Sequence, residues 1–115
     1  MKLKEAIRKA DALRPNTLDE EQKVKWVVEL EGEIAEIERT DLPEDGWAEQ
    51  DPVLLMPYPK DEIYVYYLMA KIDFANEEMQ LYADDSVVAN ERITEAKAWW
   101  VRNHMPRRPK RIRWW

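Results

Sequence analysis

Side chains able to do covalent or acid–base chemistry are few in this sequence and are not grouped. The chain has no cysteine, which excludes disulfides, thiolate catalysis and zinc–thiolate sites. His104 is its only histidine, and it follows a predicted helix whose C-terminal end a cation would complement. Catalysis by His104 would require a positioned partner, which the neighbouring sequence does not supply. We therefore expect that the protein is not an enzyme.

The sequence also lacks the patterns of cofactor and metal sites. Two glycines, Gly32 and Gly46, are too few for a glycine-rich phosphate-binding loop. No ligand cluster indicates a transition metal, although carboxylates alone can hold calcium weakly. The acidic neighbours Asp84 and Asp85 point to different sides of a helix, which is typical of a solvated face. We expect no cofactor and no dedicated metal site.

The most unusual segment is the C-terminal arm, residues 106–115. Residues 101–115 carry six basic side chains and no acid, whereas the remaining 12 basic and 24 acidic residues give residues 1–100 a net charge of -12. The body and the arm are therefore electrostatic opposites. The arm residues that we expect to bind a partner are Arg107, Arg108, Lys110, Arg111, Ile112, Arg113, Trp114 and Trp115.

Several interpretations of the arm compete. It is a nucleic-acid arm if its arginines meet phosphates and its tryptophans stack on bases. A membrane-surface segment usually needs an amphipathic helix, which ten residues with two prolines do not form. A disordered solubilising tail fits the charges but not two terminal tryptophans. We favour docking to a protein, because Trp and Arg dominate protein interfaces and the acidic body would repel a duplex held close to it.

High charge and scarce glycine predict an all-α domain, a bundle of about four helices over residues 1–105, followed by the extended arm 106–115. Apolar spacing predicts a helix over residues 3–13, which Pro15 and Asn16 end. A capping box from Thr17 to Glu20 predicts a second helix running to about Arg39. The last helix has a core stripe advancing by seven, four, three and four residues, consisting of Tyr82, Ala89, Ile93, Ala96 and Trp100. Trp99, Val88 and Leu81 form a flanking row that could serve a neighbour.

A long loop and a short turn separate these helices. Residues 40–59 carry four prolines and predict a loop, in which residues 53–56 lie extended on the core or add to a partner, and Trp47 anchors the loop at the surface. The pattern loosens at residues 76–78, where the chain turns into a hairpin or bends slightly.

The rest of the chain is organised around a central helix within residues 57–79. Apolar side chains of residues 63–70 point all round this helix, so it requires contacts on every face. A chain of this length is expected to supply about two sides, which leaves the others to further copies or partners. Glu31 and Glu38 lie within the wide apolar arc of the second helix. In one interpretation the arc is two adjacent contact faces and the acids snorkel between them. In the other, Glu31 or Glu38 accepts an arginine from the arm of a neighbour. Our candidate subunit-interface residues are Trp26, Glu31, Glu38, Tyr64, Tyr66, Tyr67 and Trp99.

Three stretches resemble the head–tail connector, or adaptor, family of tailed bacteriophages and prophages. They are residues 57–58 with 61–74, residues 21–26 with 29–32, and Asn103-His104-Met105-Pro106. The similarity covers nearly the whole chain as a pattern of helices and aromatic positions, not as a catalytic signature. The sequence departs from the family pattern at residue 77, where a glycine would follow Asn76.

The resemblance implies a structural virion protein, located at the head–tail interface and assembled in the host cytoplasm. Such adaptors form a ring, commonly of twelve copies, beneath the portal protein. The ring extends the DNA channel and receives the next connector or tail-completion protein, and the C-terminal arm engages the portal. An acidic lumen would let double-stranded DNA pass without specific binding. No run of about 20 apolar residues indicates a membrane span.

Two other functions remain open from the residues alone. An acidic inhibitor or antitoxin-like protein would mimic DNA with its carboxylates and bind a basic partner, although a basic aromatic arm would spoil such a decoy. Steep salt sensitivity would distinguish it from a ring held by apolar helices. A basic-tailed DNA-binding regulator would bind duplex DNA only while the residues after Pro106 are present.

Overall fold

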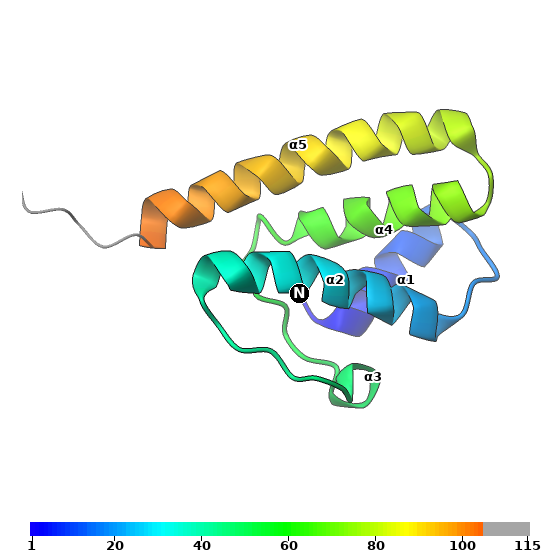
Figure 1. Cartoon of the computed structure of the whole chain (residues 1–115). Coiled ribbons are helices and arrows are strands. Elements are labelled where there is room, and N and C mark those ends of the chain that lie inside the picture. The colour runs from blue at the N-terminus through cyan, green and yellow to red at the C-terminus, as the bar shows by residue number, and fades with distance from the viewer. Residues whose placement is uncertain (105–115) are drawn as a thin grey trace, which may run out of the picture.

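The computed structural model describes residues 1–104, except for the side chain of His104, and this part contains five helices and no named strand (Figure 1). The helices are α1 (Leu3–Leu13), α2 (Glu20–Glu38), α3 (Trp47–Gln50), α4 (Glu62–Ala75) and α5 (Met79–His104). The predicted all-α class is confirmed, and the first helix has the predicted bounds. The expectation of about four helices missed α3, a single turn within residues 40–59. The predicted arm lies outside the described residues.

Helix α4 lies at the centre of the molecule, with α5 along one side and α1 and α2 along the other (Figure 1). Ile63, Leu68 and Ile72 are completely or almost completely buried, as the all-round apolar pattern predicted. The chain covers about two sides of α4, as expected, and leaves Tyr66 and Tyr67 half-buried and Phe74 exposed. Three of its own helices contact α4, because α1 packs against it as well as α2 and α5.

A buried carboxylate joins α2, α4 and the segment before α4. Glu31 is only 1 % exposed, and its Oε1 accepts a hydrogen bond from the hydroxyl of Tyr64. Its Oε2 accepts the N–H of Leu55 at 2.9 Å, and the Tyr64 oxygen accepts the N–H of Met56 at 2.9 Å. Burial raises the pKa of Glu31, while burial and the Glu31 charge raise the pKa of Tyr64. These contacts satisfy the buried polar groups and fix residues 55–56 to the bundle.

The segment before α4 also pairs with the start of the chain. The N–H of Leu3 donates to the carbonyl oxygen of Pro52 at 3.0 Å, and the N–H of Leu54 donates to that of Met1 at 2.9 Å. The side chains of Leu54 and Met56 enter the core, which agrees with the predicted alternative that this segment lies against the core, but only Val53 forms a bridge, with Lys2, and residues 55–56 bend. Trp47 is also a core residue and not a surface anchor, since it is buried and its Nε1–H donates to the carbonyl oxygen of Pro43.

The predicted capping box at the start of α2 is absent. The helix begins at Glu20 with Asp19 as its N-cap, two residues later than the predicted N-cap Thr17, and Asp19 makes no side-chain capping bond. Asn16 organises the turn from α1 instead. Its Oδ1 accepts the N–H of Leu18 at 3.1 Å, while its Nδ2 donates to Asp11 Oδ1 at 2.9 Å. The side chain of Asn16 thus satisfies a backbone group that a helical turn at residues 17–19 would have used.

The turn between α4 and α5 makes these helices an antiparallel hairpin (Figure 1). The N–H of Glu78 donates to the carbonyl oxygen of Asp73, and the N–H of Glu77 donates to that of Phe74, which is the Schellman arrangement. Glu77 has a φ of +61°, in the left-handed region that favours glycine. The non-glycine residue that separates this sequence from the connector pattern therefore occupies a strained position.

Replacing Tyr64 by phenylalanine should destabilise the fold. The Tyr64→Phe change leaves Glu31 Oε1 and the Met56 N–H without their partner, at a cost of about 1–3 kcal/mol in free energy of unfolding. Tyr67→Phe is the matched control, because the Tyr67 hydroxyl makes no hydrogen bond to other described residues, and its effect should stay within about 0.5 kcal/mol. Urea denaturation measures both, and equal losses would contradict the role given to the Tyr64 hydroxyl.

Replacing Glu77 by glycine should stabilise the fold. Relief of the left-handed strain outweighs the larger backbone entropy of glycine in the unfolded chain, for a net gain of about 0.5–1 kcal/mol. Glu77→Ala removes the same charge but keeps Cβ, so it should leave stability nearly unchanged. Thermal melts of the two variants provide the comparison. A glycine variant no more stable than the alanine variant would show that the turn is not strained.

Candidate functional site at the α4–α5 hairpin

An aromatic groove of about 300 Å³ lies between α4 and α5. Each helix contributes residues that repeat at the spacing of a single helical face. Five of the lining side chains are apolar or aromatic, and three are polar or charged. The lining residues are Tyr67, Ala70, Lys71 and Phe74 from α4, and Tyr82, Ser86, Ala89 and Asn90 from α5.

Two ring systems give the groove its character. Phe74 is 59 % exposed and meets Tyr82 edge-on, with ring centroids 5.2 Å apart and an interplanar angle of 63°. Lys71 Nζ lies 5.3 Å from the centroid of the Tyr67 ring. Burial, followed by the charges of Glu29 and Glu33, raises the pKa of Tyr67. The groove therefore combines exposed aromatic surface with acidic side chains on the neighbouring helix α2.

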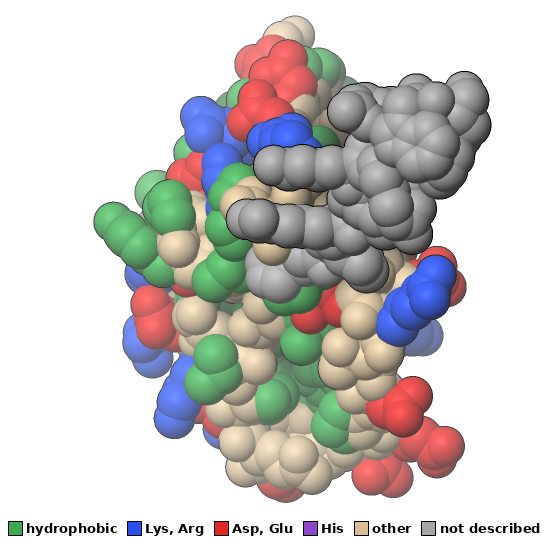
Figure 2. Space-filling view, turned by 90° about the vertical axis from the view of Figure 1, so that its left-hand side faces the viewer, with side chains coloured by type: hydrophobic (Ala, Val, Ile, Leu, Met, Phe, Trp, Pro, Cys, Tyr) green, Lys and Arg blue, Asp and Glu red, His purple; other side chains and the backbone are tan. Residues whose placement is uncertain are grey.

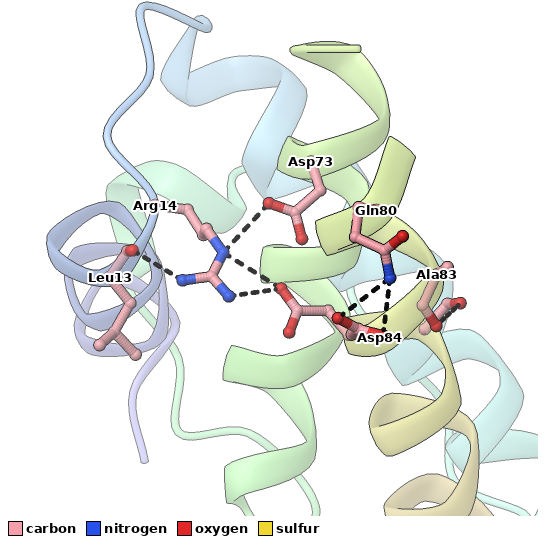
Figure 3. A network of polar contacts seen from close by, with 8 residues as sticks. Leu13, Arg14, Asp73, Gln80, Ala83 and Asp84 are labelled. Carbon is pink, nitrogen blue, oxygen red and sulfur yellow. Dashed lines mark hydrogen bonds and ion pairs between the residues drawn. The ribbon is translucent and has the colours of Figure 1, made fainter. Parts of the chain in front are cut away.

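A cluster of one arginine and two aspartates holds α1 against the same hairpin (Figure 3). Arg14 Nε lies 3.1 Å from Asp73 Oδ1 and 3.1 Å from Asp85 Oδ2, and Arg14 Nη2 lies 2.9 Å from Asp85 Oδ2. Arg14 Nη1 also donates to the carbonyl oxygen of Leu13 at 3.0 Å. One side chain at the end of α1 thus links α4 and α5 next to their turn.

The two carboxylates of this cluster compete for one arginine. Asp73 is 1 % exposed, and its Oδ2 has no hydrogen-bond partner among the described residues. Burial, then the hydrogen bond and charge of Asp85, raise the pKa of Asp73 to about 7, against the opposing effect of Arg14. Asp73 therefore binds a proton as pH falls below neutrality, which removes its repulsion from Asp85.

A second hollow, of about 850 Å³, lies between α2 and α3. Its one aromatic lining residue, Trp47, is buried in the core, so the hollow presents no exposed ring. Its acidic side chains are all exposed, and none makes an ion pair with another described residue. The six acids are Asp19, Glu20, Glu21, Glu44, Asp45 and Glu49.

Two of the candidate interface residues lie inside the molecule. Glu31 and Tyr64 are fully buried and bonded to each other, so neither can contact another subunit. The hypothesis that Glu31 snorkels to the surface or receives an arginine from a neighbour is wrong, because Tyr64 and Leu55 already supply its donors. The half-buried candidates are Trp26, Glu38, Tyr66, Tyr67 and Trp99. The arm candidates, Arg107 to Trp115, lie outside the described residues.

The sequence reasoning missed the Arg14 cluster, although a signal for it was present. The apolar stripe of α5 jumps from Tyr82 to Ala89, and the intervening position on that face is Asp85, which is buried and not solvated as expected. Asp73 likewise follows Ile72 on the buried side of α4. Acids at core positions on two neighbouring helices require a shared cation. Arg14 could have been proposed as that cation, since it ends the helix that must cover them.

No group of histidines or acids within residues 1–104 is arranged to hold a metal ion. None of the described helices has both the length and the apolar character needed to span a bilayer. No protein-family model, curated protein or solved structure matches the chain in comparisons with known proteins. The functional argument therefore depends on the geometry of the surface.

Replacing Asp73 by asparagine should flatten the dependence of stability on pH. The folded protein holds a proton on Asp73 between pH 3.8 and about 7 that the unfolded chain does not hold, so its stability falls as pH rises through this window. In the Asp73→Asn variant the side-chain amide can donate a hydrogen bond to the Asp85 carboxylate at every pH. We expect a relative gain of about 1–3 kcal/mol for the variant between pH 5 and pH 8.

Asp84→Asn is the control for this prediction. Asp84 is exposed, outside the Arg14 cluster, and bonded only to Gln80 in the described structure. Its replacement should leave the slope of the melting temperature against pH unchanged. Glu31, whose pKa is also raised, contributes to that slope equally in the parent and in this variant. If the melting temperature depended on pH with the same slope in the parent and Asp73→Asn proteins, the raised pKa of Asp73 would be contradicted.

Proposed function

We propose that this protein is a structural adaptor of the head–tail connector type in a tailed bacteriophage or prophage. It assembles into a ring, of about twelve copies as the resemblance implies, beneath the portal protein. The ring extends the DNA channel and receives the next connector or tail-completion protein. It acts at the head–tail interface of the virion, without catalysis or a cofactor.

The distribution of exposed apolar side chains supports this proposal most strongly. Among the described residues, five of the eight large apolar side chains that remain exposed lie on the α4–α5 hairpin, which also holds the aromatic groove. A hairpin that packs one face internally and leaves apolar groups on another favours association with further protein. The five residues are Phe74, Met79, Leu81, Val87 and Val101.

The charge of the surface supports passage of DNA through such a ring. Figure 2 views the molecule from the end at which α5 finishes, and acidic side chains appear at its upper and lower edges with apolar ones between them. Acidic side chains facing a channel repel phosphates and keep a moving duplex from binding. Apolar contacts between subunits and an acidic lumen are compatible roles for different faces of one small domain.

A second candidate function follows from the acidic hollow between α2 and α3. Six carboxylates without ion pairs among the described residues could imitate the phosphates of DNA and bind a basic protein as an inhibitor or antitoxin does. Rising salt distinguishes the two functions. A carboxylate mimic loses its partner steeply, whereas a ring held by apolar contacts persists at about 0.5 M salt, where the screening length is only a few ångströms.

The connector function can be tested by mixing the protein with the portal protein encoded nearby. We expect the intact chain to form rings stacked on the portal in electron micrographs, and the chain cut after Pro106 to bind much less. A Trp114→Ala/Trp115→Ala variant separates the aromatic contribution of the arm from its charge.

Absence of portal binding by every form would contradict the connector function. Capture of a basic enzyme that salt releases would then favour the inhibitor. Binding of duplex DNA that disappears on removal of the residues after Pro106 would favour the DNA-binding regulator considered from the sequence.

A further inference from the structure

The aromatic groove lies far along α5 from the point where the arm begins. Its α5 residues start at Tyr82, twenty-two residues before His104, which corresponds to about 33 Å of helix. The turn of the hairpin and the end of α5 lie at opposite ends of the molecule (Figure 1). The eleven residues that follow His104 span at most about 36–40 Å when fully extended. The reach of the arm therefore allows its last residues to approach the groove of its own chain as well as that of another copy, and the proposed ring is what favours the second arrangement.

The composition of the arm fits this groove on another copy. Trp114 and Trp115 can bury their indoles against exposed aromatic surface at Phe74 and Tyr82. The basic residues before them would meet Glu77 and other exposed acids around the groove: Glu78 at the turn, and Glu29 on α2. Lys71 lies on the ring of Tyr67, and Glu33 already pairs with Lys97 at 3.6 Å, so Glu29, Glu77 and Glu78 are the acids that remain for the arm.

The energies involved favour the aromatic groove over the more acidic hollow between α2 and α3. Burying a large apolar side chain contributes about 1.5–3 kcal/mol, whereas an exposed ion pair contributes about 0–1 kcal/mol. The acidic hollow has Trp47 as its one aromatic lining side chain, and that side chain is buried in the core, so the hollow presents no exposed ring. Two tryptophans therefore gain most in the groove that has exposed rings.

We propose that the aromatic groove of one copy binds the Trp114-Trp115 end of the arm of the next copy. This inference rests on the proposed ring, for which it names the joining contact. The arm begins at one end of the molecule and the groove lies at the other. Each subunit would therefore place its arm on one neighbour and receive the arm of the other neighbour in its groove. Repetition of such a head-to-tail contact closes a ring when the rotation between copies permits it.

The absence of cysteine from the chain permits a direct test by cross-linking. Two full-length single-cysteine proteins, Ser86→Cys in the groove and Ile112→Cys in the arm, are mixed and treated with a short bis-maleimide. We expect a hetero-dimer at a yield at least about tenfold above that of random encounter, because docking raises the effective concentration of the two thiols. Glu49→Cys in the acidic hollow and exposed Thr94→Cys on α5 replace Ser86→Cys as controls.

A matched pair of substitutions tests whether the aromatic surface is responsible. Phe74→Ser should lower the cross-link at Ser86→Cys at least about fivefold, because it removes an exposed ring from the groove. Val87→Ser should leave the yield unchanged, since Val87 is similarly exposed at 57 % but does not line the groove. Circular dichroism confirms that both variants keep the helical content of the parent.

Three results would overturn the inference: a yield at Ser86→Cys no higher than at Thr94→Cys, a higher yield at Glu49→Cys, or insensitivity to Phe74→Ser. Portal binding by the same proteins separates this inference from the proposed function. Rings on the portal without the cross-link would leave the connector function standing and refute the arm contact. The cross-link without portal binding would establish the contact between copies and contradict the connector function.

Discussion

The structure depends on the burial of one carboxylate, that of Glu31. A carboxylate away from water is unfavourable unless donors replace its hydration, and here both donors are fixed by the fold. Tyr64 comes from α4, and the Leu55 N–H comes from the segment that precedes α4. The same hydroxyl of Tyr64 accepts the Met56 N–H. One polar group on α2 therefore sets where the chain enters its central helix, and with it the position of the hairpin.

This arrangement gives the α4–α5 hairpin an inner face that packs on α1 and α2 and an outer face that they do not cover. The inner face of α4 is covered by α1 and α2, and Arg14 ties the end of α1 to Asp73 and Asp85. The Glu31 cluster is satisfied internally, and the hairpin leaves exposed aromatic and aliphatic side chains, while the hollow between α2 and α3 leaves exposed acids. A small acidic domain with an apolar groove at one end and a basic aromatic arm at the other has complementary surfaces for its own kind. The proposed self-assembly rests on these surfaces.

Periodicity predicted most of the helices but not the polar contacts between them. The first helix, the central apolar helix and the core stripe of the last helix all depend on local spacing, which the sequence displays directly. Glu31 and Asp85 were misjudged because their partners are distant in sequence, so that a buried acid resembles a surface one. The Thr17 capping box failed because Asn16 bonds the same turn from outside the motif. The groove emerged only from packing, since Phe74 and Tyr82 belong to different helices.

The most direct test of the central role of Glu31 is residue-resolved amide hydrogen exchange of the full-length protein by NMR. The account predicts that the N–H groups of Leu55 and Met56 exchange as slowly as those in the middle of α4, because their acceptors lie in the same cooperative unit. Exchange at Leu55 and Met56 as fast as at residues 41–45 would contradict it. Such a result would mean that the segment before α4 opens independently, and that the buried carboxylate does not position the hairpin.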